Sequence, residues 1–174
     1  NYLVPDTLVL LTGVTGVTLG TTAGANVVQL EDTTAPTPLC IATTSDGLAF
    51  DFAENAFADN TIALTMQVNG TGTNYAVTSV TGNGSSSLSM HTAASLSAND
   101  WVLFNYAGTT LTSAIRDAAN NLLPGDGVGG YSAVQGSDGN NTINLTSLGL
   151  SNGYDIQSAG GNDAVTGSTG DDWI

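Results

Sequence analysis

Positive charge is almost absent from this chain. There is no lysine, and a single arginine, Arg116, faces fifteen carboxylates, so the formal net charge is −14. Such a surface repels the phosphates of nucleic acids and the headgroups of anionic membranes. We therefore expect neither nucleic acid nor a membrane among its partners.

Histidine and cysteine occur only once each, as His91 and Cys40. One nitrogen and one sulfur ligand cannot complete a tetrahedral zinc site. Catalysis by a Ser/His/Asp or Cys/His set needs a base, and the only histidine lies in the strand-like run Leu88-Ser-Met-His. We expect no enzymatic activity. Cys40 can form no internal disulfide and is expected to be a small buried residue.

Long apolar runs are also missing, and no segment approaches the length needed to cross a bilayer. The chain has neither an initiator methionine nor a leader-like segment, and it ends inside a repeat, so we expect a fragment of a larger protein. Its hydrophobic content of 41% nevertheless favours a folded core over disorder.

A nine-residue pattern recurs at the end of the chain. Against the frame G-G-x-G-x-D-x-U-x, in which U is a large apolar residue, copies occupy residues 136–144, 158–166 and 167–174. Repeats of this kind form a glycine-rich turn followed by a short strand whose apolar residue points inward. The expected interior residues are Ile143, Val165 and Ile174.

The turns are rich in the oxygen ligands that Ca²⁺ prefers, and glycine lets several carbonyls face one point. The sixth position of the frame is Asn141, Asp163 and Asp172 in the three copies. The candidate metal ligands are Gly136, Asp138, Asn141, Gly161, Asp163, Asp171 and Asp172. A series of Gly/Asn/Asp turns without metal is the alternative.

These residues resemble the repeats-in-toxin (RTX) solenoid of secreted bacterial proteins. The resemblance implies that turns 136–141 and 158–163 share one calcium ion, with Asp163 its surest ligand. The insertion 145–157 would form the opposite edge, and the third turn would face that edge without a partner. Asn141 in place of aspartate, and Ser158-Ala159 in place of glycines, imply a weaker first site.

The middle of the chain has the alternation of half-buried strands. Apolar residues occupy every second position in residues 48–52 and again in 62–68, and turn residues recur between the strand-like runs. Pro36 and Pro38 mark a boundary before these strands. The only helix-like piece, 111–121, is short and polar. An antiparallel sandwich is expected.

This section resembles the immunoglobulin-like repeats of large bacterial surface proteins, through the motifs that begin at Asp32, Val68, Val77 and Ile115. The resemblance implies an all-β protein in which an immunoglobulin-like β-sandwich precedes a short parallel β-solenoid. The expected divisions are an N-terminal β segment 1–31, a sandwich 32–130 and repeats 131–174. The first segment either ends an upstream module or adds strands to the next.

Several residues are candidates for binding outside the repeats. Asp51, Glu54 and Asp59 could hold a second calcium ion, although a solvated acidic loop is the favoured interpretation. The glycine-rich stretch 124–131 is either a linker or a binding loop. Aromatic and acidic residues in or beside the glycine-rich region give the candidate ligand-binding set of Asp126, Tyr131, Tyr154 and Asp155.

Together the two resemblances imply the C-terminal, ligand-binding region of an RTX adhesin, exported to the bacterial cell surface by a type I system. Such a chain folds when it meets extracellular Ca²⁺. The expected function is adhesion through a peptide or protein on another cell, with a bound Ca²⁺ receiving a carboxylate, by a monomeric module. Alternatives are a calcium-rigidified spacer, a glycan-binding module, and a non-catalytic flank of an RTX enzyme.

Overall fold

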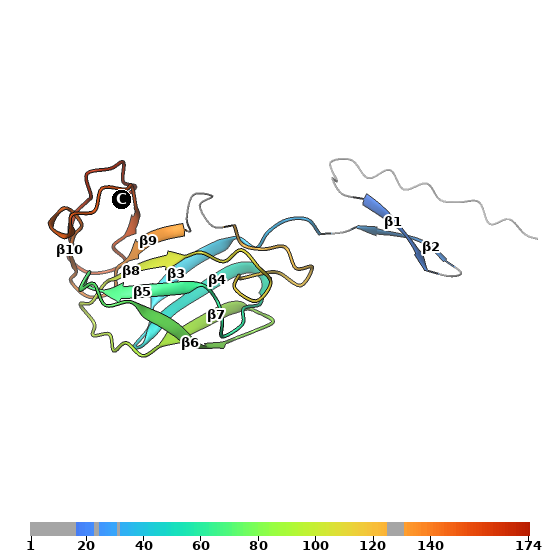
Figure 1. The fold of residues 1–174 in the computed structure, drawn as a ribbon, viewed down its shortest axis with the longest axis horizontal. Helices are drawn as coiled ribbons and strands as arrows, with labels where there is room; N and C mark the ends of the chain where they lie inside the picture. The colour runs from blue at the N-terminus through green and yellow to red at the C-terminus, as the bar shows by residue number, and fades with distance from the viewer. Residues whose placement is uncertain (1–16, 23–24, 31, 125–130) are drawn as a thin grey trace, which may run out of the picture. The chain divides into compact units, whose positions relative to one another are not determined.

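The structure, a computed structural model, describes residues 17–22, 25–30, 32–124 and 131–174. These residues are all-β, with one short 3-10 helix, η1 (Thr146–Leu148), and no α-helix among them (Figure 1). No helix within the described ranges is long and apolar enough to span a bilayer. The chain divides into two compact units, Asn1–Thr33 and Thr34–Ile174.

The first unit contains one antiparallel hairpin. Its strands β1 (Val17–Thr22) and β2 (Ala25–Leu30) pair in continuous register from Val17↔Leu30 to Thr22↔Ala25. Both strands are rich in β-branched and apolar residues, which suit an extended, pleated backbone. The hairpin forms its own two-stranded sheet.

The second unit is built on an eight-stranded mixed sheet with the order β11-β9-β8-β5-β6-β7-β4-β3. A further parallel pair, β10 and β12, forms a separate sheet. The strands are β3 (Pro38–Thr43), β4 (Gly47–Ala56), β5 (Leu64–Val68), β6 (Tyr75–Thr81), β7 (Ser85–Thr92), β8 (Val102–Tyr106), β9 (Tyr131–Gln135), β10 (Thr142–Asn144), β11 (Asp155–Gln157) and β12 (Ala164–Thr166).

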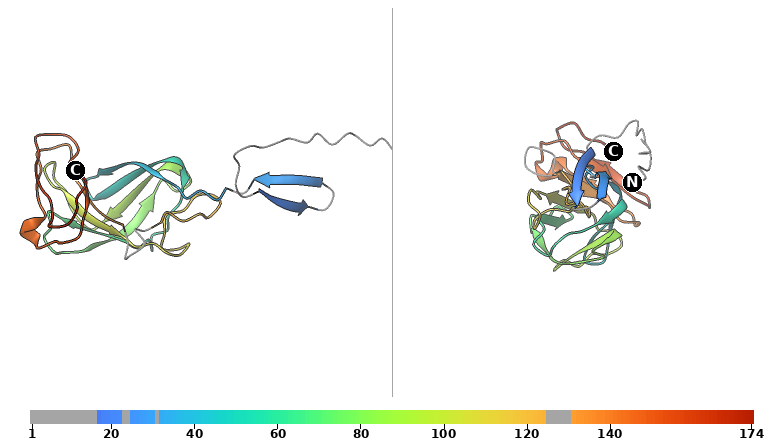
Figure 2. Two further views of the ribbon diagram at one scale, coloured as in Figure 1. Left: turned by 90° about the horizontal axis from the view of Figure 1, so that it is seen from above. Right: turned by 90° about the vertical axis from the view of Figure 1, so that its right-hand side faces the viewer.

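The large sheet bends at β6 so that its two halves face each other. The first residues of β6 pair with β5, at Met66↔Tyr75 and Thr65↔Ala76, whereas the rest of the strand pairs with β7. The Phe50 ring on β4 packs edge-on against the Phe104 ring on β8, with 5.9 Å between the ring centroids. Three strands separate β4 from β8 in the sheet order, so this contact is made across the fold rather than along the sheet. The halves therefore form two layers (Figure 2).

The core between the layers follows the alternation seen in the sequence. Leu48, Phe50 and Phe52 on β4 are buried, and so are Leu64 and Met66 on β5. The residues between them face outward or are half-buried. Burying an apolar side chain of this size stabilises the fold by about 1.5–3 kcal/mol. The predicted strand periodicity is confirmed here.

The end of the chain winds in coils whose strands run parallel. Strand β11 pairs with β9 (Ile156↔Val134), and β12 pairs with β10 (Ile143↔Val165), so successive strands alternate between two stacks. A bridge between Asp155 and Trp173 begins the next layer of the first stack. These coils gather at one end of the sheet (Figures 1 and 2).

Strand β9 is buried on both faces because it belongs to the sheet and to the coils. Ala133 packs into the core between the layers, whereas its neighbour Val134 packs into a second core inside the coils. Trp101 and Leu103, beside and on β8, also face the second core. The division expected at residue 130/131 thus falls beside a strand that both cores share.

Two local expectations differ from the structure. Cys40 is exposed rather than buried, because β3 is an edge strand with a register shift between Pro38 and Cys40, and Ile41 is the residue that faces the core. The helix-like segment 111–121 forms turns.

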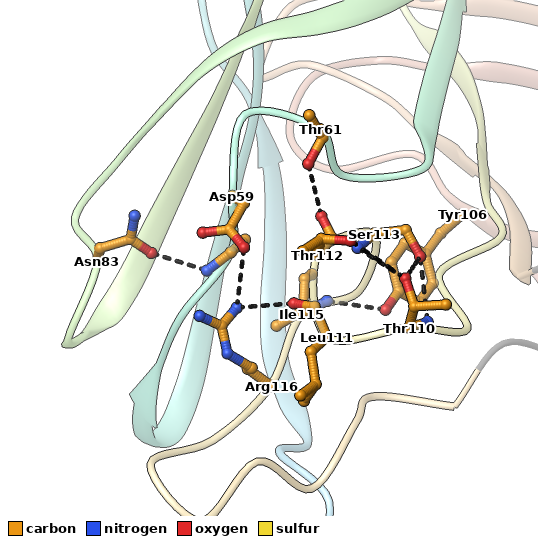
Figure 3. Close-up of polar contacts among 11 residues, drawn as sticks. Asp59, Thr61, Asn83, Tyr106, Thr110, Leu111, Thr112, Ser113, Ile115 and Arg116 are labelled. Carbon is orange, nitrogen blue, oxygen red and sulfur yellow. Dashed lines mark hydrogen bonds and ion pairs between the residues drawn. The ribbon is translucent and has the colours of Figure 1, made fainter.

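Arg116 ties that turn segment to the sheet. Its Nη1 donates to the Leu111 carbonyl at 3.1 Å and lies 3.6 Å from Asp59 Oδ2 (Figure 3). The backbone also bridges Arg116 to Phe57 and to Leu122. The single cation of the chain therefore pairs with Asp59, and not with its neighbour Asp117.

Candidate functional site

The first edge of the coils brings the turns 136–141 and 158–163 side by side. The Gly136 N–H donates to the Gln157 carbonyl at 2.7 Å, the Ala164 N–H donates to the Asn141 carbonyl at 2.9 Å, and the Asn162 N–H donates to Asn140 Oδ1 at 2.8 Å. These bonds connect residues about 22 positions apart, one full coil of the chain. The two turns that the repeat register pairs are therefore hydrogen-bonded neighbours in the structure.

Glycine allows the two turns to approach this closely. A Cβ on Gly136 would lie 2.2 Å from the Ser158 carbonyl oxygen, and one on Gly161 would lie 2.5 Å from the Gly139 carbonyl oxygen. Gly161 also has φ +108°, a conformation that side-chain-bearing residues rarely adopt. Glycine at these two positions therefore leaves room for a carbonyl oxygen of the neighbouring turn.

The sixth positions connect the turns to each other. The Asn141 N–H donates to Asp163 Oδ1 at 2.9 Å. Asn141 itself is only 1% exposed, and its Oδ1 accepts from the Ser137 N–H at 2.9 Å. Its Nδ2 donates to the Asn99 carbonyl and to Ser137 Oγ, each at 2.9 Å. Asn141 thus fastens the first turn to the end of the sheet.

The second edge has the same arrangement between residues 149–154 and the third turn. The Tyr154 N–H donates to Asp172 Oδ1 at 2.9 Å, and the Ser168 N–H donates to Asp172 Oδ2 at 2.7 Å. A Cβ on Gly153 would meet the Asp171 carbonyl oxygen at 2.1 Å. The third turn therefore has a partner, which the insertion supplies.

Burial raises the pKa of the Tyr154 hydroxyl above its ordinary value, and the negative charge of Asp172 raises it further. The neutral phenol is therefore the form favoured beside the second edge.

The first edge carries oxygen ligands of the kind that Ca²⁺ prefers in proteins. Asp163 and Asp138 supply carboxylates, and the Ser158 and Gly139 carbonyl oxygens lie close to the backbones of Gly136 and Gly161 in the facing turns. Asp138 Oδ1 lies 3.3 Å from the position of a Cβ on Gly160 in the neighbouring turn. Asn141 fits less well, since protein groups already engage both ends of its amide.

The seven candidate metal ligands do not form one cluster. Asp171 and Asp172 lie on the second edge, and the other five lie on the first. The Asp172 carboxylate accepts hydrogen bonds from the Tyr154 backbone N–H, the Ser168 N–H and the Ser168 hydroxyl. Among the described residues it therefore accepts more hydrogen bonds than the Asp163 carboxylate, which accepts one from the Asn141 N–H. A carboxylate offers about four lone-pair positions, so a metal would share it with these donors.

Two of the predicted ligand-binding residues, Asp155 and Tyr154, line different cavities. Asp155 lines a groove of about 290 Å³ with residues of β3 and with Phe50 and Tyr106. Tyr154 lines a different and smaller cavity of about 90 Å³ beside Asn105. Tyr131 pairs through its backbone with Tyr106, and Asp126 lies outside the described residues. Tyr154 and Asp155 therefore belong to separate sites.

The acidic residues around β4 do not gather as one site. Asp51 and Glu54 lie on the strand itself rather than in a loop, and Asp59 pairs with Arg116. Glu54 faces Asp117, with carboxylate oxygens within 4.8 Å. Asp117 is only 2% exposed, and its Oδ1 and Oδ2 accept from the backbone and side-chain N–H groups of Asn121.

His91 makes more contacts than an ordinary strand residue. Its Nδ1 lies 3.1 Å from both carboxylate oxygens of Asp46, and its Nε2 lies 3.1 Å from Thr81 Oγ1. The Asp46 carbonyl also accepts from the Thr92 N–H and hydroxyl. This chain of contacts fastens the turn between β3 and β4 to β7.

Of the three residues expected inside the coils, Ile143 is buried and Val165 is partly buried, whereas Ile174 is 79% exposed because no further coil covers it among the described residues. Sequence reasoning also missed Val134 and Ile156, which are 1% and 3% exposed. Val134 precedes Ile143 by nine residues, and Ile156 precedes Val165 by nine. Extending the nine-residue spacing backwards from each clear copy would have found both. The glycines that define the frame are largely absent around Ile156, which hid that copy.

No protein-family model matches this chain, and no curated protein or solved structure is significantly similar to it.

Proposed function

We propose that this chain is a calcium-dependent adhesion module of a large bacterial surface protein, in which an immunoglobulin-like sandwich precedes a short RTX-type solenoid. The observation that carries the proposal is the stacking of oxygen-rich turns on both edges of the coils, two repeats apart. The net charge of −14 supports it, because bound cations would offset repulsion among the carboxylates.

In this proposal Ca²⁺ binds as the coils form. Asp138 and Asp163 would hold it on the first edge, together with the carbonyls of Gly136 and Gly161, and the ion would supply positive charge that the chain lacks. Binding free energy then contributes directly to folding. The protein would thus be weakly folded where calcium is scarce and stable outside the cell.

The proposed ligand is a peptide or protein on another cell, bound by a monomeric and non-enzymatic module. The groove beside Asp155 has an apolar lining that includes Ile41, Phe50 and Leu123. Leu39, at 69% exposure, extends that apolar surface outward. A bound Ca²⁺ would help this acidic chain to receive a ligand carboxylate.

Calcium titration followed by thermal melting tests the folding part of the proposal. The melting temperature should rise with millimolar Ca²⁺, and Asp163→Asn should reduce that rise while Asp51→Asn, an exposed strand residue, leaves it unchanged. An identical melting curve in excess EDTA and in Ca²⁺ would refute calcium-dependent folding.

A peptide array probed with and without Ca²⁺ tests the ligand part. Peptide binding that disappears with EDTA, and weakens in Asp155→Asn, is the expected result. Absence of any hit in both conditions, with calcium-dependent melting intact, would instead favour the calcium-rigidified spacer, an alternative that the separation of Tyr154 from Asp155 also suits.

A further inference from the structure

We propose that a second groove binds a neutral saccharide. This asparagine groove has a volume of about 470 Å³ and lies where the end of the sheet meets β10, and its lining includes Asn99, Asn140, Asn144, Thr142, Trp101 and Leu148. The biological role of this saccharide site rests on the proposed adhesion function. The chemical class of its ligand is argued from the geometry of the groove alone.

Three asparagine amides in the groove have a fixed orientation. Asn99 Oδ1 accepts from the Asn140 N–H at 3.1 Å, Asn140 Oδ1 accepts from the Asn162 N–H at 2.8 Å, and Asn144 Oδ1 accepts from the Ser147 N–H at 3.0 Å. Because each oxygen is held by a backbone donor, the NH₂ group of each amide is directed away from that bond.

Those three NH₂ groups form no hydrogen bond with the part of the chain that the structure describes. All three asparagines are exposed. Thr142 and Asn144 point outward from β10 on either side of the buried Ile143, so the alternation of the strand places their polar groups in the groove. Three amides whose NH₂ groups are not engaged by the described residues therefore line the groove, beside the hydroxyl groups of Thr142 and Ser147.

The same lining decides the class of ligand. Among the residues that the structure describes, no charged side chain lines the groove, so an ionic group would find no direct salt-bridge partner in its lining. An anion would have to approach a chain of net charge −14. Hydroxyl-rich neutral molecules remain, since sugar oxygens accept from amide N–H groups while sugar hydroxyls donate to the oxygens of Thr142 and Ser147.

Trp101 and Leu148 form the apolar part of the groove. Trp101 is 4% exposed and packs in the core of the coils. Leu148 on η1 packs against Gly70, where a Cβ would lie 2.2 Å from Leu148 Cδ1. Small apolar surfaces held beside fixed donors suit the C–H face and hydroxyl edge of a sugar ring. The volume is within the range of about 300–1,000 Å³ that is usual for small-molecule sites.

The experiment uses ¹⁵N-labelled protein in millimolar Ca²⁺, titrated with glucose, galactose, mannose, N-acetylglucosamine and dextran oligosaccharides up to tens of millimolar. At least one sugar should shift the side-chain NH₂ signals of Asn99, Asn140 and Asn144 in a saturable way. Galacturonate should bind more weakly than galactose, because the chain repels its carboxylate.

Asn140→Asp and Asn144→Asp provide the decisive variants. Aspartate keeps the oxygen that accepts the backbone N–H but replaces the NH₂ donors with a negative charge, so the fold is retained while sugar affinity should fall about tenfold or more. Asn83→Asp is the matched control, because Asn83 Oδ1 likewise accepts a backbone N–H, from Ala58, outside the groove. The Asn83→Asp variant should bind sugar with the same affinity as the parent protein.

Three results would overturn the proposal: no saturable shift with any sugar of the set, equal affinity in all variants, or tighter binding of galacturonate than of galactose. A melting curve recorded on each sample separates these results from failure of the calcium hypothesis. Sugar binding that persists in EDTA by a folded protein would support the groove and refute calcium-dependent folding, whereas calcium-dependent melting without sugar binding would do the reverse.

Discussion

Asn141 shows how one atom changes the role of a repeat position. The frame places a carboxylate at the sixth position, and Asp163 and Asp172 each accept a backbone N–H from the neighbouring coil. Asn141 also lies against the sheet, where its Nδ2 donates to the Asn99 carbonyl. An aspartate could not make that bond, which explains the departure from the frame in physical terms.

Asn141→Asp should therefore destabilise the protein when calcium is absent. The buried carboxylate would face the Asn99 carbonyl oxygen without a donor between them, at a cost of about 1–3 kcal/mol or more. Urea denaturation in EDTA measures the change, with Asn83→Asp as a control for the added charge. An unchanged unfolding midpoint for Asn141→Asp would contradict the fastening role.

Asp100 makes stability depend on pH. The Ser97 N–H donates to Asp100 Oδ2 at 2.7 Å, and the Asn69 Nδ2 donates to Oδ1. The backbone bond from Ser97, followed by the bond from Asn69, holds the pKa of this carboxyl below its ordinary value. Its contribution to stability is thus present above the unfolded pKa of about 3.9 and is lost as the pH falls through the folded pKa.

We expect the free energy of unfolding to fall as the pH drops below about 4, and to fall less steeply in Asp100→Asn. The asparagine cannot titrate, so its variant loses stability at neutral pH and little more in acid. Urea denaturation at a series of pH values in EDTA measures both slopes. Parallel curves for the two proteins would assign the acid sensitivity to other carboxylates.

At the scale of the element, the sequence predicted what is periodic. Strands β4 and β5 were foreseen because Leu48, Phe50 and Leu64 belong to runs in which every second residue is apolar. The turns 136–141 and 158–163 were foreseen because glycine and aspartate recur at nine-residue spacing. Both patterns are local, and the backbone geometry that produces them is fixed within a few residues.

What escaped prediction depends on contacts between distant segments. Strand β9 carries Ala133 and Val134 on opposite faces, yet two buried faces leave no alternation to distinguish core from surface. Cys40 was misplaced because edge position and a register shift follow from sheet order. The asparagine groove was missed because its lining comes from distant parts of the chain, at Asn69, at residues 99–101 and at residues 140–148.

Substitutions at two glycines test whether the coils need glycine because neighbouring turns approach closely, or only because the backbone adopts a positive φ. Gly161→Ala should destabilise strongly, since φ is +108° and the new Cβ would lie 2.5 Å from the Gly139 carbonyl oxygen. Gly149→Ala should cost only about 1 kcal/mol, because φ is +69° but no atom of the described residues lies within 4 Å of the added Cβ. Thermal melting in Ca²⁺ compares them, and equal losses would contradict the crowding argument.

At the scale of the whole molecule, charge should dominate the response to salt. A chain of net charge −14 repels itself in the compact state, and ions screen that repulsion. In EDTA, NaCl should raise the melting temperature. Millimolar Ca²⁺ should raise it further at high NaCl, whereas Mg²⁺ at the same concentration should not match it. Equal effects of the two divalent ions would indicate screening without a specific site.

Strand β9 has one more consequence. Because Val134 already stands in the first stack when the sheet is complete, β11 adds to an existing edge, and the Asp155–Trp173 bridge adds to β11 in turn. A parallel coil built this way avoids the unfavourable first step of ordering two layers at once. Assembly should therefore be seeded by the sheet and proceed outward, so that hydrogen exchange would be slowest at β9 and fastest at the last turn.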